Sequence, residues 1–235
     1  MKPTWYHTEN EYIRLLHLPY TIWHLSYVLL GAAMAPTVFL DRTLFTLTAF
    51  FLAMGIGAHY MDEMNGRPLQ TTIKDEELMA ISIISVLVAC ILGIIGMILV
   101  TALLLPFILF GGFIVAAYSL EWFDGKLHTD NWFAVSWGAF PMITAFFINA
   151  ETITISALAM AFGCWALSRA QRVLSTRVRE VRRKIHAVQL AITYHDSTGR
   201  ILGKEYLMKP SEEALKFLTV TITTMSIALF IWRLV

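Results

Sequence analysis

Residues 78–118 form an almost unbroken apolar run, and this run limits the possible folds of the chain more than any other feature. A single helix of that length would be about 60 Å long, roughly twice the thickness of the hydrocarbon core of a bilayer. We therefore expect two membrane-spanning helices here, with a turn near residues 98–104, ahead of Pro106. The whole chain has 57% hydrophobic and 15% charged residues, whereas a soluble domain carries about 25% charged residues. The composition predicts an integral membrane protein.

Seven apolar segments are expected to cross the membrane, so the predicted fold class is all-α. Their ranges are about 20–40, 43–63, the two halves of 78–118, 132–148, 152–167 and 215–235. We expect tight turns at Asp41-Arg42 and at Asn149-Ala-Glu151. Cys90 and Cys164 lie inside apolar runs and are expected to be inert core thiols.

The composition changes after the sixth apolar segment. The stretch from Arg169 to Lys184 is strongly basic and has apolar residues at helical spacing, which predicts an amphipathic helix on the membrane surface. Alternating residues near 188–194 and the turn signal Asp196-Ser-Thr-Gly199 predict a small β-hairpin. We therefore divide the chain into a six-span membrane core (1–172), a basic helix with hairpin (173–210) and a seventh membrane helix (211–235).

The basic residues are distributed unevenly between the two faces of this predicted bundle. With seven spans, all 18 lysines and arginines except Arg42 and Arg233 fall on the face that holds the N-terminus. Cytoplasmic loops of membrane proteins carry an excess of lysine and arginine. We therefore expect a multi-pass protein of the cell membrane with its basic loops in the cytoplasm.

Polar side chains collect at the span ends on the same face. The candidates are His24, His59, Asp62, Glu63, Asn65, Arg67, Tyr118, Glu121, His128, Asp130, Arg169 and Arg172. In a helix, His59, Asp62 and Glu63 would share one side. Carboxylates suit Mg²⁺, whereas histidines with carboxylates suit Zn or Fe. Two other readings stay open: an ion pair between Glu63 and Arg67, four residues apart, and a phosphate site at Arg169 and Arg172.

Several of these residues resemble motifs of the UbiA-type polyprenyl transferase superfamily over residues 15–172. The similar segments are Leu18-Pro19-Tyr20-Thr21, Asp62 followed by Arg67-Pro68-Leu69, Tyr118-Ser119 and Gly138-Ala139-Phe140-Pro141. The chain departs from the family pattern at Ala58 and Gly66, where the family has Asn and a second Asp. It departs again at residues 168–172, where the family has its second aspartate-rich motif and this chain has no carboxylate. The family usually has nine spans rather than seven.

The resemblance implies a Mg-dependent transfer of a prenyl group from a prenyl diphosphate to a lipophilic acceptor. It implies catalytic roles for Asp62, Glu63 and Arg67, with His59 near the metal. The expected substrate-binding residues are His24, Asn65, Tyr118, Glu121, His128, Asp130, Arg169 and Arg172. The expected partners are membrane lipid and an isoprenoid, without nucleic acid.

Two alternatives remain beside prenyl transfer. A core that has lost its metal motifs could bind an isoprenoid or lipid without turning it over, or act as an assembly factor. Alternatively, the histidines and carboxylates could form a transition-metal site for redox or hydrolytic chemistry. Convergence of two histidine nitrogens on a carboxylate would favour the metal enzyme, and carboxylates facing arginines would favour a diphosphate site.

Overall fold

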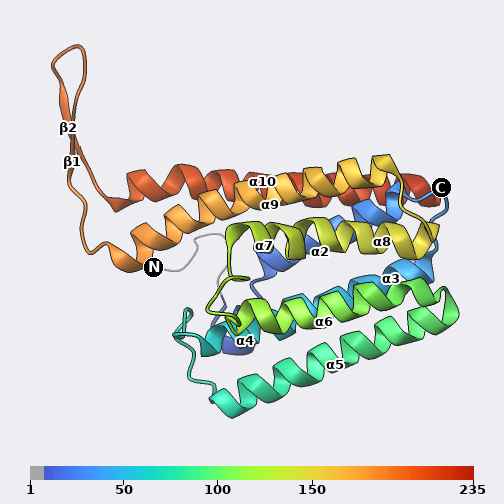
Figure 1. The fold of residues 1–235 in the computed structure, drawn as a ribbon. Coiled ribbons are helices and arrows are strands. Elements are labelled where there is room, and N and C mark those ends of the chain that lie inside the picture. Colours follow the sequence, from blue (N-terminus) through green and yellow to red (C-terminus); the bar gives the residue numbers. More distant parts are fainter. Residues whose placement is uncertain (1–7) are drawn as a thin grey trace.

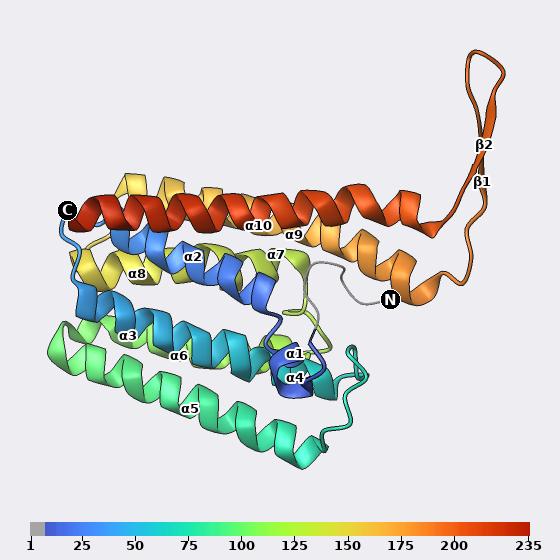
Figure 2. The ribbon, with the colours of Figure 1, turned by 180° about the vertical axis from the view of Figure 1, so that it is seen from behind.

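The computed structural model describes residues 8–235 as a bundle of long helices with one small hairpin (Figures 1 and 2). The helices are α1 (Glu11–Leu15), α2 (Leu18–Met34), α3 (Leu40–Phe50), η1 (Phe51–Ala58), α4 (His59–Met64), α5 (Asp75–Leu99), η2 (Ala102–Leu104), α6 (Leu105–Ser119), α7 (Asp130–Ala134), η3 (Val135–Ala139), α8 (Phe140–Ala150), α9 (Ile155–Lys184) and α10 (Lys204–Leu234). The strands are β1 (Leu190–Thr193) and β2 (Gly199–Leu202). The segments η1 and η3 are π-helical and η2 is a 3₁₀ turn.

Five helical segments of the described chain are long and apolar enough to cross a membrane. They are Leu40–Met64, Asp75–Leu99, Ala102–Ser119, Asp130–Ala150 and Lys204–Leu234. The expectation of a helical membrane protein is therefore supported. Two further helices lie beside these five: α2, which has 17 residues, and α9, whose last turn is basic.

The long helices lie roughly parallel in three layers (Figures 1 and 2). Helices α9 and α10 form one outer layer, α2 and α8 lie in the middle, and α5 and α6 lie on the opposite side with α3. Helix α2 packs tightly against α8, because Gly31 has no side chain to keep the two backbones apart. A Cβ at this position would overlap the carbonyl oxygen of Met142. Trp23, Tyr27 and Phe146 complete this central core.

Two of the three predicted turns agree with the structure. The long apolar run breaks at Val100, and Thr101 caps the next turn by accepting from the Leu103 amide. Glu151 ends α8 with a φ of 54°. The predicted turn at Asp41-Arg42 is wrong: both residues lie in the first turn of α3, because α2 already ends at Met34, ahead of Pro36.

The basic segment differs from the prediction. Residues 173–184 continue α9 and do not form a separate helix. A row of buried side chains on one side of α9 packs this part of the helix against the bundle. These side chains are Ser168, Gln171, Ser175, Val178 and Val181. Helix α10 begins at Lys204 and contains Pro210 near its start, whereas a start at Ser211 was expected. The hairpin is confirmed, with Leu190 opposite Leu202 in an antiparallel pair. It stands away from the bundle (Figure 1).

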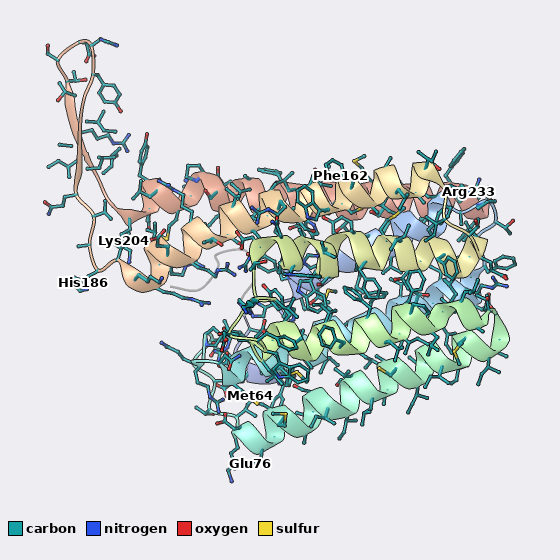
Figure 3. The ribbon with its side chains drawn as sticks, in the orientation of Figure 1. Met64, Glu76, Phe162, His186, Lys204 and Arg233 are labelled. Carbon is teal, nitrogen blue, oxygen red and sulfur yellow. The ribbon has the colours of Figure 1, made fainter. Side chains whose placement is uncertain are left out.

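One end of the bundle, here called the polar end, holds the C-termini of α4, α6 and α9 and the N-termini of α2, α5, α7 and α10 (Figures 1 and 3). At the opposite end, Arg42 donates to the Ile148 carbonyl at 2.8 Å, and Arg233 donates to the Ala35 and Pro36 carbonyls at 2.8 Å each. These two arginines therefore hold loops at that end. Lys2, counted on the basic face, lies outside the described residues.

Candidate functional site

Asp62 lies on α4 at the polar end of the bundle. Its Oδ1 is buried and has no hydrogen-bond partner among the described residues. Ser119 lies beside the carboxylate, and its hydroxyl donates to the Ala58 carbonyl at 3.3 Å. The carboxylate interacts electrostatically with His128, Arg172 and other cations of the polar end. Asp62 is therefore available to a ligand or a proton.

The neighbouring carboxylate, Glu63, is used to fold a loop. It is fully buried, and its Oε1 accepts from the Thr71 amide at 2.9 Å and the Thr71 hydroxyl at 3.0 Å. Its Oε2 accepts from the Leu69 amide at 2.9 Å. Both oxygens thus hold the connection between α4 and α5, and Glu63 does not share the environment of Asp62.

Arg67 and Asn65 also serve this connection. Arg67 pairs with Asp75 and donates to the Ile73 carbonyl at 2.6 Å, so the ion pair with Glu63 is not formed. The amide of Asn65 donates to the Ser119 carbonyl and joins the ends of α4 and α6. Within residues 8–235, neither Arg67 nor Asn65 forms a hydrogen bond with Asp62.

Three histidines line the inner side of the polar end. The rings of His17 and His59 lie 4.8 Å apart, and Nδ1 of His59 is 3.3 Å from the Gly55 carbonyl. His24 is 2% exposed, and neither of its ring nitrogens has a hydrogen-bond partner within residues 8–235. The backbone of Trp137 lies beside the His24 ring outside hydrogen-bond geometry. A buried ring without partners is unusual, because buried polar groups are normally satisfied.

His17 directly precedes α2, and its pKa reflects the positive charge around it. Burial lowers the pKa of His17 well below its ordinary value of 6.5, and His59, Arg183 and Arg179 lower it further. Positive charge therefore surrounds the ring. An anion placed among these groups would meet a favourable field.

Tyr118 and His128 form a stacked pair at the polar end. Their ring centroids are 4.4 Å apart, and Nδ1 of His128 is 2.9 Å from the Tyr118 carbonyl. Tyr118 lies in the last turn of α6 and is buried against Trp137. The pair thus joins the loop after α6 to the interior of the bundle. Glu121, in the same loop, is exposed and has a φ of 53°.

Asp130 anchors the arginines at the middle of α9. Nε of Arg172 donates to Oδ1 of Asp130 at 2.8 Å, and Arg169 lies 3.1 Å from Oδ2. The Arg172 guanidinium also lies over the Phe133 ring, 4.9 Å from its centroid. One carboxylate thus neutralises part of the charge of two arginines.

Arg179 is a site residue that sequence reasoning missed. It is half-buried, interacts electrostatically with Arg172, Tyr118 and Asp62, and forms no salt bridge among the described residues. Its guanidinium donates to the Thr176 hydroxyl at 2.9 Å. The spacing of Arg172 and Arg179, seven residues apart in a helix, places both on one side and was the available signal.

The polar cluster, as we name it, consists of His17, His24, His59, Asp62, Tyr118, His128, Arg172 and Arg179. Buried atoms without partners lie on the elements around it: Ser136 Oγ on η3 and Gln171 Oε1 on α9. The cationic groups exceed the carboxylates in the cluster. Such an arrangement suits a phosphate or diphosphate, which is anionic and accepts many hydrogen bonds.

The donor set does not suit a resident metal ion. Within residues 8–235, no three side chains of His, Cys, Asp or Glu are grouped closely enough to hold a metal ion. Glu63, which would share Mg²⁺ with Asp62, has both oxygens hydrogen-bonded to the loop. His59 lies against a backbone carbonyl and another histidine.

Comparisons with known proteins give no further assignment for this site. No protein-family model matches the chain, and no curated protein or solved structure matches it. The similarity to the UbiA-type superfamily therefore stays a prediction.

Proposed function

We propose that all seven long helices cross the cell membrane and that the polar end faces the cytoplasm. The position of α2 supports seven membrane-spanning helices, because α2 packs in the middle of the bundle between helices that are long enough to cross the membrane. The first half of α9 is buried along α10 and α8 in the same way. The excess of arginine and lysine at the polar end supports the orientation.

We propose further that the polar cluster binds the phosphorylated head of an isoprenoid, a prenyl diphosphate, in a bundle similar to the UbiA type. The observation that carries this proposal is Arg179, a half-buried cation that forms no salt bridge in the described chain. A charge taken out of water is costly unless it is paired. The phosphate oxygens supply that pairing, and the isoprenoid tail remains in the membrane.

The cluster binds this head through protein cations. Arg172 and Arg179 lie on one side of α9 and interact electrostatically, and arginine matches phosphate geometry with paired donors. The Tyr118 hydroxyl lies near Arg172, Arg179 and Asp62 and adds a donor. Magnesium has no part in the proposal, because Glu63 is committed to the loop.

The test is direct binding of a non-hydrolysable geranylgeranyl diphosphate analogue to the purified full-length protein. The matched ligand is geranylgeraniol, which has the same tail and no phosphate. We expect the diphosphate to bind at least about tenfold more tightly, equivalent to about 1.4 kcal/mol. Equal affinity of the two ligands would contradict the proposal, because the tail alone would then account for binding.

Prenyl transfer is a second candidate function, favoured by the unpaired oxygen of Asp62. In this reaction the bond between C1 of the prenyl chain and the diphosphate oxygen breaks, and the diphosphate leaves with the electron pair. A nucleophilic atom of the acceptor forms the new bond to C1, and Asp62 takes the proton that the acceptor loses. The arginines stabilise charge on the leaving diphosphate.

Release of diphosphate separates the two candidates. The protein is incubated with a prenyl diphosphate and a lipid extract as the source of acceptor, and the Asp62→Asn variant is the control. Diphosphate release that depends on both the extract and Asp62 identifies a transferase. Tight binding without release in any extract leaves binding alone as the function.

A further inference from the structure

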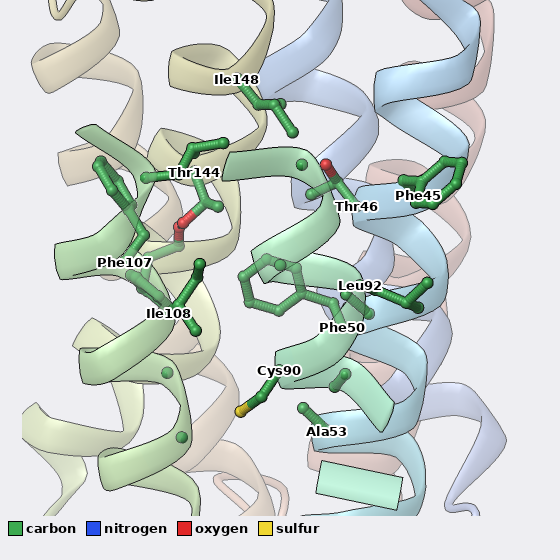
Figure 4. Close-up of a pocket in the computed structure, with 18 of the residues that line it drawn as sticks. Phe45, Thr46, Phe50, Ala53, Cys90, Leu92, Phe107, Ile108, Thr144 and Ile148 are labelled. Carbon is green, nitrogen blue, oxygen red and sulfur yellow. The ribbon is translucent and has the colours of Figure 1, made fainter. Parts of the chain in front are cut away.

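An apolar space lies among α3, η1, α5, α6 and α8. It has a volume of about 110 Å³. Figure 4 shows Phe50, Cys90, Phe107, Ile108 and Thr144 around it. Protein interiors contain few voids larger than a water molecule, and this space is several times larger than one water molecule needs. Its size therefore admits a narrow ligand.

This apolar cavity is separate from the polar cluster. On the helix formed by α3, η1 and α4, the last lining residue toward the polar end is Ala53. Asp62 lies nine residues further on, a rise of about 13 Å. Between these positions lies a packed core; its buried members are Met54, Ala58, Met61, Val115, Tyr118 and Trp137.

Small residues on two helices create the cavity. Ala89 and Gly93 of α5 face Gly111 and Gly112 of α6. A Cβ at Gly93 would lie 2.8 Å from Cγ1 of Ile108, so larger residues here would close the space. The aromatic rings of Phe107 and others on α3 and α8 form the remaining wall.

The cavity offers almost no polar groups to a ligand. The hydroxyl of Thr46 donates to the Arg42 carbonyl at 2.8 Å, and the hydroxyl of Thr144 donates to the Phe140 carbonyl at 2.7 Å. Both hydroxyls are therefore already used within their own helices. The Cys90 thiol is a weak donor. A ligand with a charged or polar group would lose its hydration here without compensation.

The surroundings indicate where an apolar ligand comes from. Phe45, on the rim of the cavity, is 41% exposed, and the outward residues of α5 beside it, such as Leu87 and Ile91, are 56% and 53% exposed. These exposed apolar surfaces lie on helices long enough to cross the membrane, so lipid chains contact them.

We propose that the apolar cavity binds one hydrocarbon chain, either the acyl chain of a lipid or an isoprenoid chain, independently of the polar cluster. The chain enters sideways from the bilayer and packs against Phe50, Phe107 and Phe140, while the small residues of α5 and α6 give it room. No head group enters the cavity. This inference stands whether or not the polar cluster binds a diphosphate.

The first test uses a long-chain alcohol that carries a photoreactive diazirine, with the full-length protein in digitonin, which has no flexible alkyl chain. We expect crosslinks in the segments of α3, α5 and α6 that line the cavity. The variant Ala89→Phe fills the space and should reduce crosslinking about tenfold. The matched control is Leu87→Phe, which adds the same ring on the lipid-facing side of α5 and should leave crosslinking unchanged.

Cys90 gives a second readout that needs no filled variant. It lines the cavity, whereas Cys164 is buried in the central core. Oleyl alcohol or geranylgeraniol should protect Cys90 from a small apolar maleimide. Stronger protection by one alcohol identifies the acyl or the isoprenoid chain as the occupant.

The proposal is overturned if Cys90 reacts equally with and without either alcohol. It is also overturned if Ala89→Phe and Leu87→Phe crosslink to the same extent, since the probe then contacts only the outer surface. The variants Arg172→Gln and Arg179→Gln should leave protection of Cys90 unchanged. Loss of protection in these variants would contradict a separate site, because the chain would then belong to a ligand held at the polar cluster.

Discussion

Nε of Arg172 donates a hydrogen bond of 2.8 Å to Oδ1 of Asp130 and thereby ties α9 to the first residue of α7. The same arginine lies over Phe133 on α7. Arg172 is thus held in place with part of its charge neutralised. Arg179, further along α9, forms no salt bridge among the described residues, and its charge is not neutralised by a direct ion pair. This difference between the two arginines underlies the proposed anion site.

The first prediction concerns this tie between α7 and α9. Asp130→Asn removes the ion pairs with Arg169 and Arg172, and we expect a loss of about 1 kcal/mol of unfolding free energy, because both partners are partly exposed. Thermal unfolding should show Tm lower by about 2–4 °C. Asp124→Asn, in the exposed loop before α7, is the control and should leave Tm unchanged. An equal Tm for both variants would mean that the tie contributes nothing.

The second prediction separates Glu63 from the functional site. Glu63→Gln places an NH₂ donor against backbone amides and a hydroxyl that need an acceptor. We therefore expect the free energy of unfolding to fall by about 1–3 kcal/mol. Hydrogen exchange at the Leu69 and Thr71 amides should accelerate, since both amides donate to Glu63. Glu76→Gln, exposed in the first turn of α5, is the matched control. Diphosphate binding should persist in both variants; its selective loss in Glu63→Gln would contradict a purely structural role.

The third prediction is a pH dependence that originates at His17. Its folded-state pKa lies below 6.5, so protonation favours the unfolded chain. The contribution of neutral His17 to the free energy of unfolding is therefore fully present above about pH 6.5. It decreases as the pH falls below that value, by at most about 1.4 kcal/mol per pH unit for one proton. His59, Arg179 and Arg183 face the ring and strengthen the effect.

Chemical unfolding across this pH range measures the effect. His17→Gln should give a flatter profile than the unmodified protein. His195→Gln, in the exposed turn of the hairpin, should leave the profile unchanged. Identical slopes for His17→Gln and the unmodified protein would contradict this assignment.

The fourth prediction concerns the contact between α2 and α8. Gly31→Ala would force a methyl group into the Met142 carbonyl, where a backbone cannot easily move. We expect destabilisation of about 1–3 kcal/mol. Gly163→Ala provides the comparison, because nothing lies within 4 Å of its Cβ position, and alanine favours a helix by about 1 kcal/mol. The two variants should shift Tm in opposite directions.

Much of the helical architecture was predictable from apolar runs and turn residues. The break near residue 100 was expected because forty residues cannot form one span, and the hairpin was expected from alternation around Asp196. The end of α2 was misplaced because Pro36 was passed over in an apolar run. The continuity of α9 was missed because the charge after Arg169 suggested a boundary, whereas buried small and polar residues carry the helix onward.

The candidate site was only partly predictable. Proximity along the chain grouped Asp62 with Glu63 and Arg67, but neighbouring residues on a helix end can face different partners. Glu63 and Arg67 turn to the α4–α5 connection, while Asp62 turns inward. The arrangement of Asp62 with Arg172 and Arg179 depends on how α4 and α9 pack, and sequence spacing does not contain that information.

In the proposed anion site, protein cations of the polar cluster, with Arg179 foremost, hold a diphosphate without metal. The most direct measurement is the affinity for a non-hydrolysable geranylgeranyl diphosphate analogue in the presence of a chelator, compared between Arg179→Gln and Arg177→Gln. Both variants remove one positive charge from α9, but Arg177 is exposed. We expect at least about tenfold weaker binding for Arg179→Gln alone. Equal affinities, or binding that disappears when the chelator is added, would contradict it.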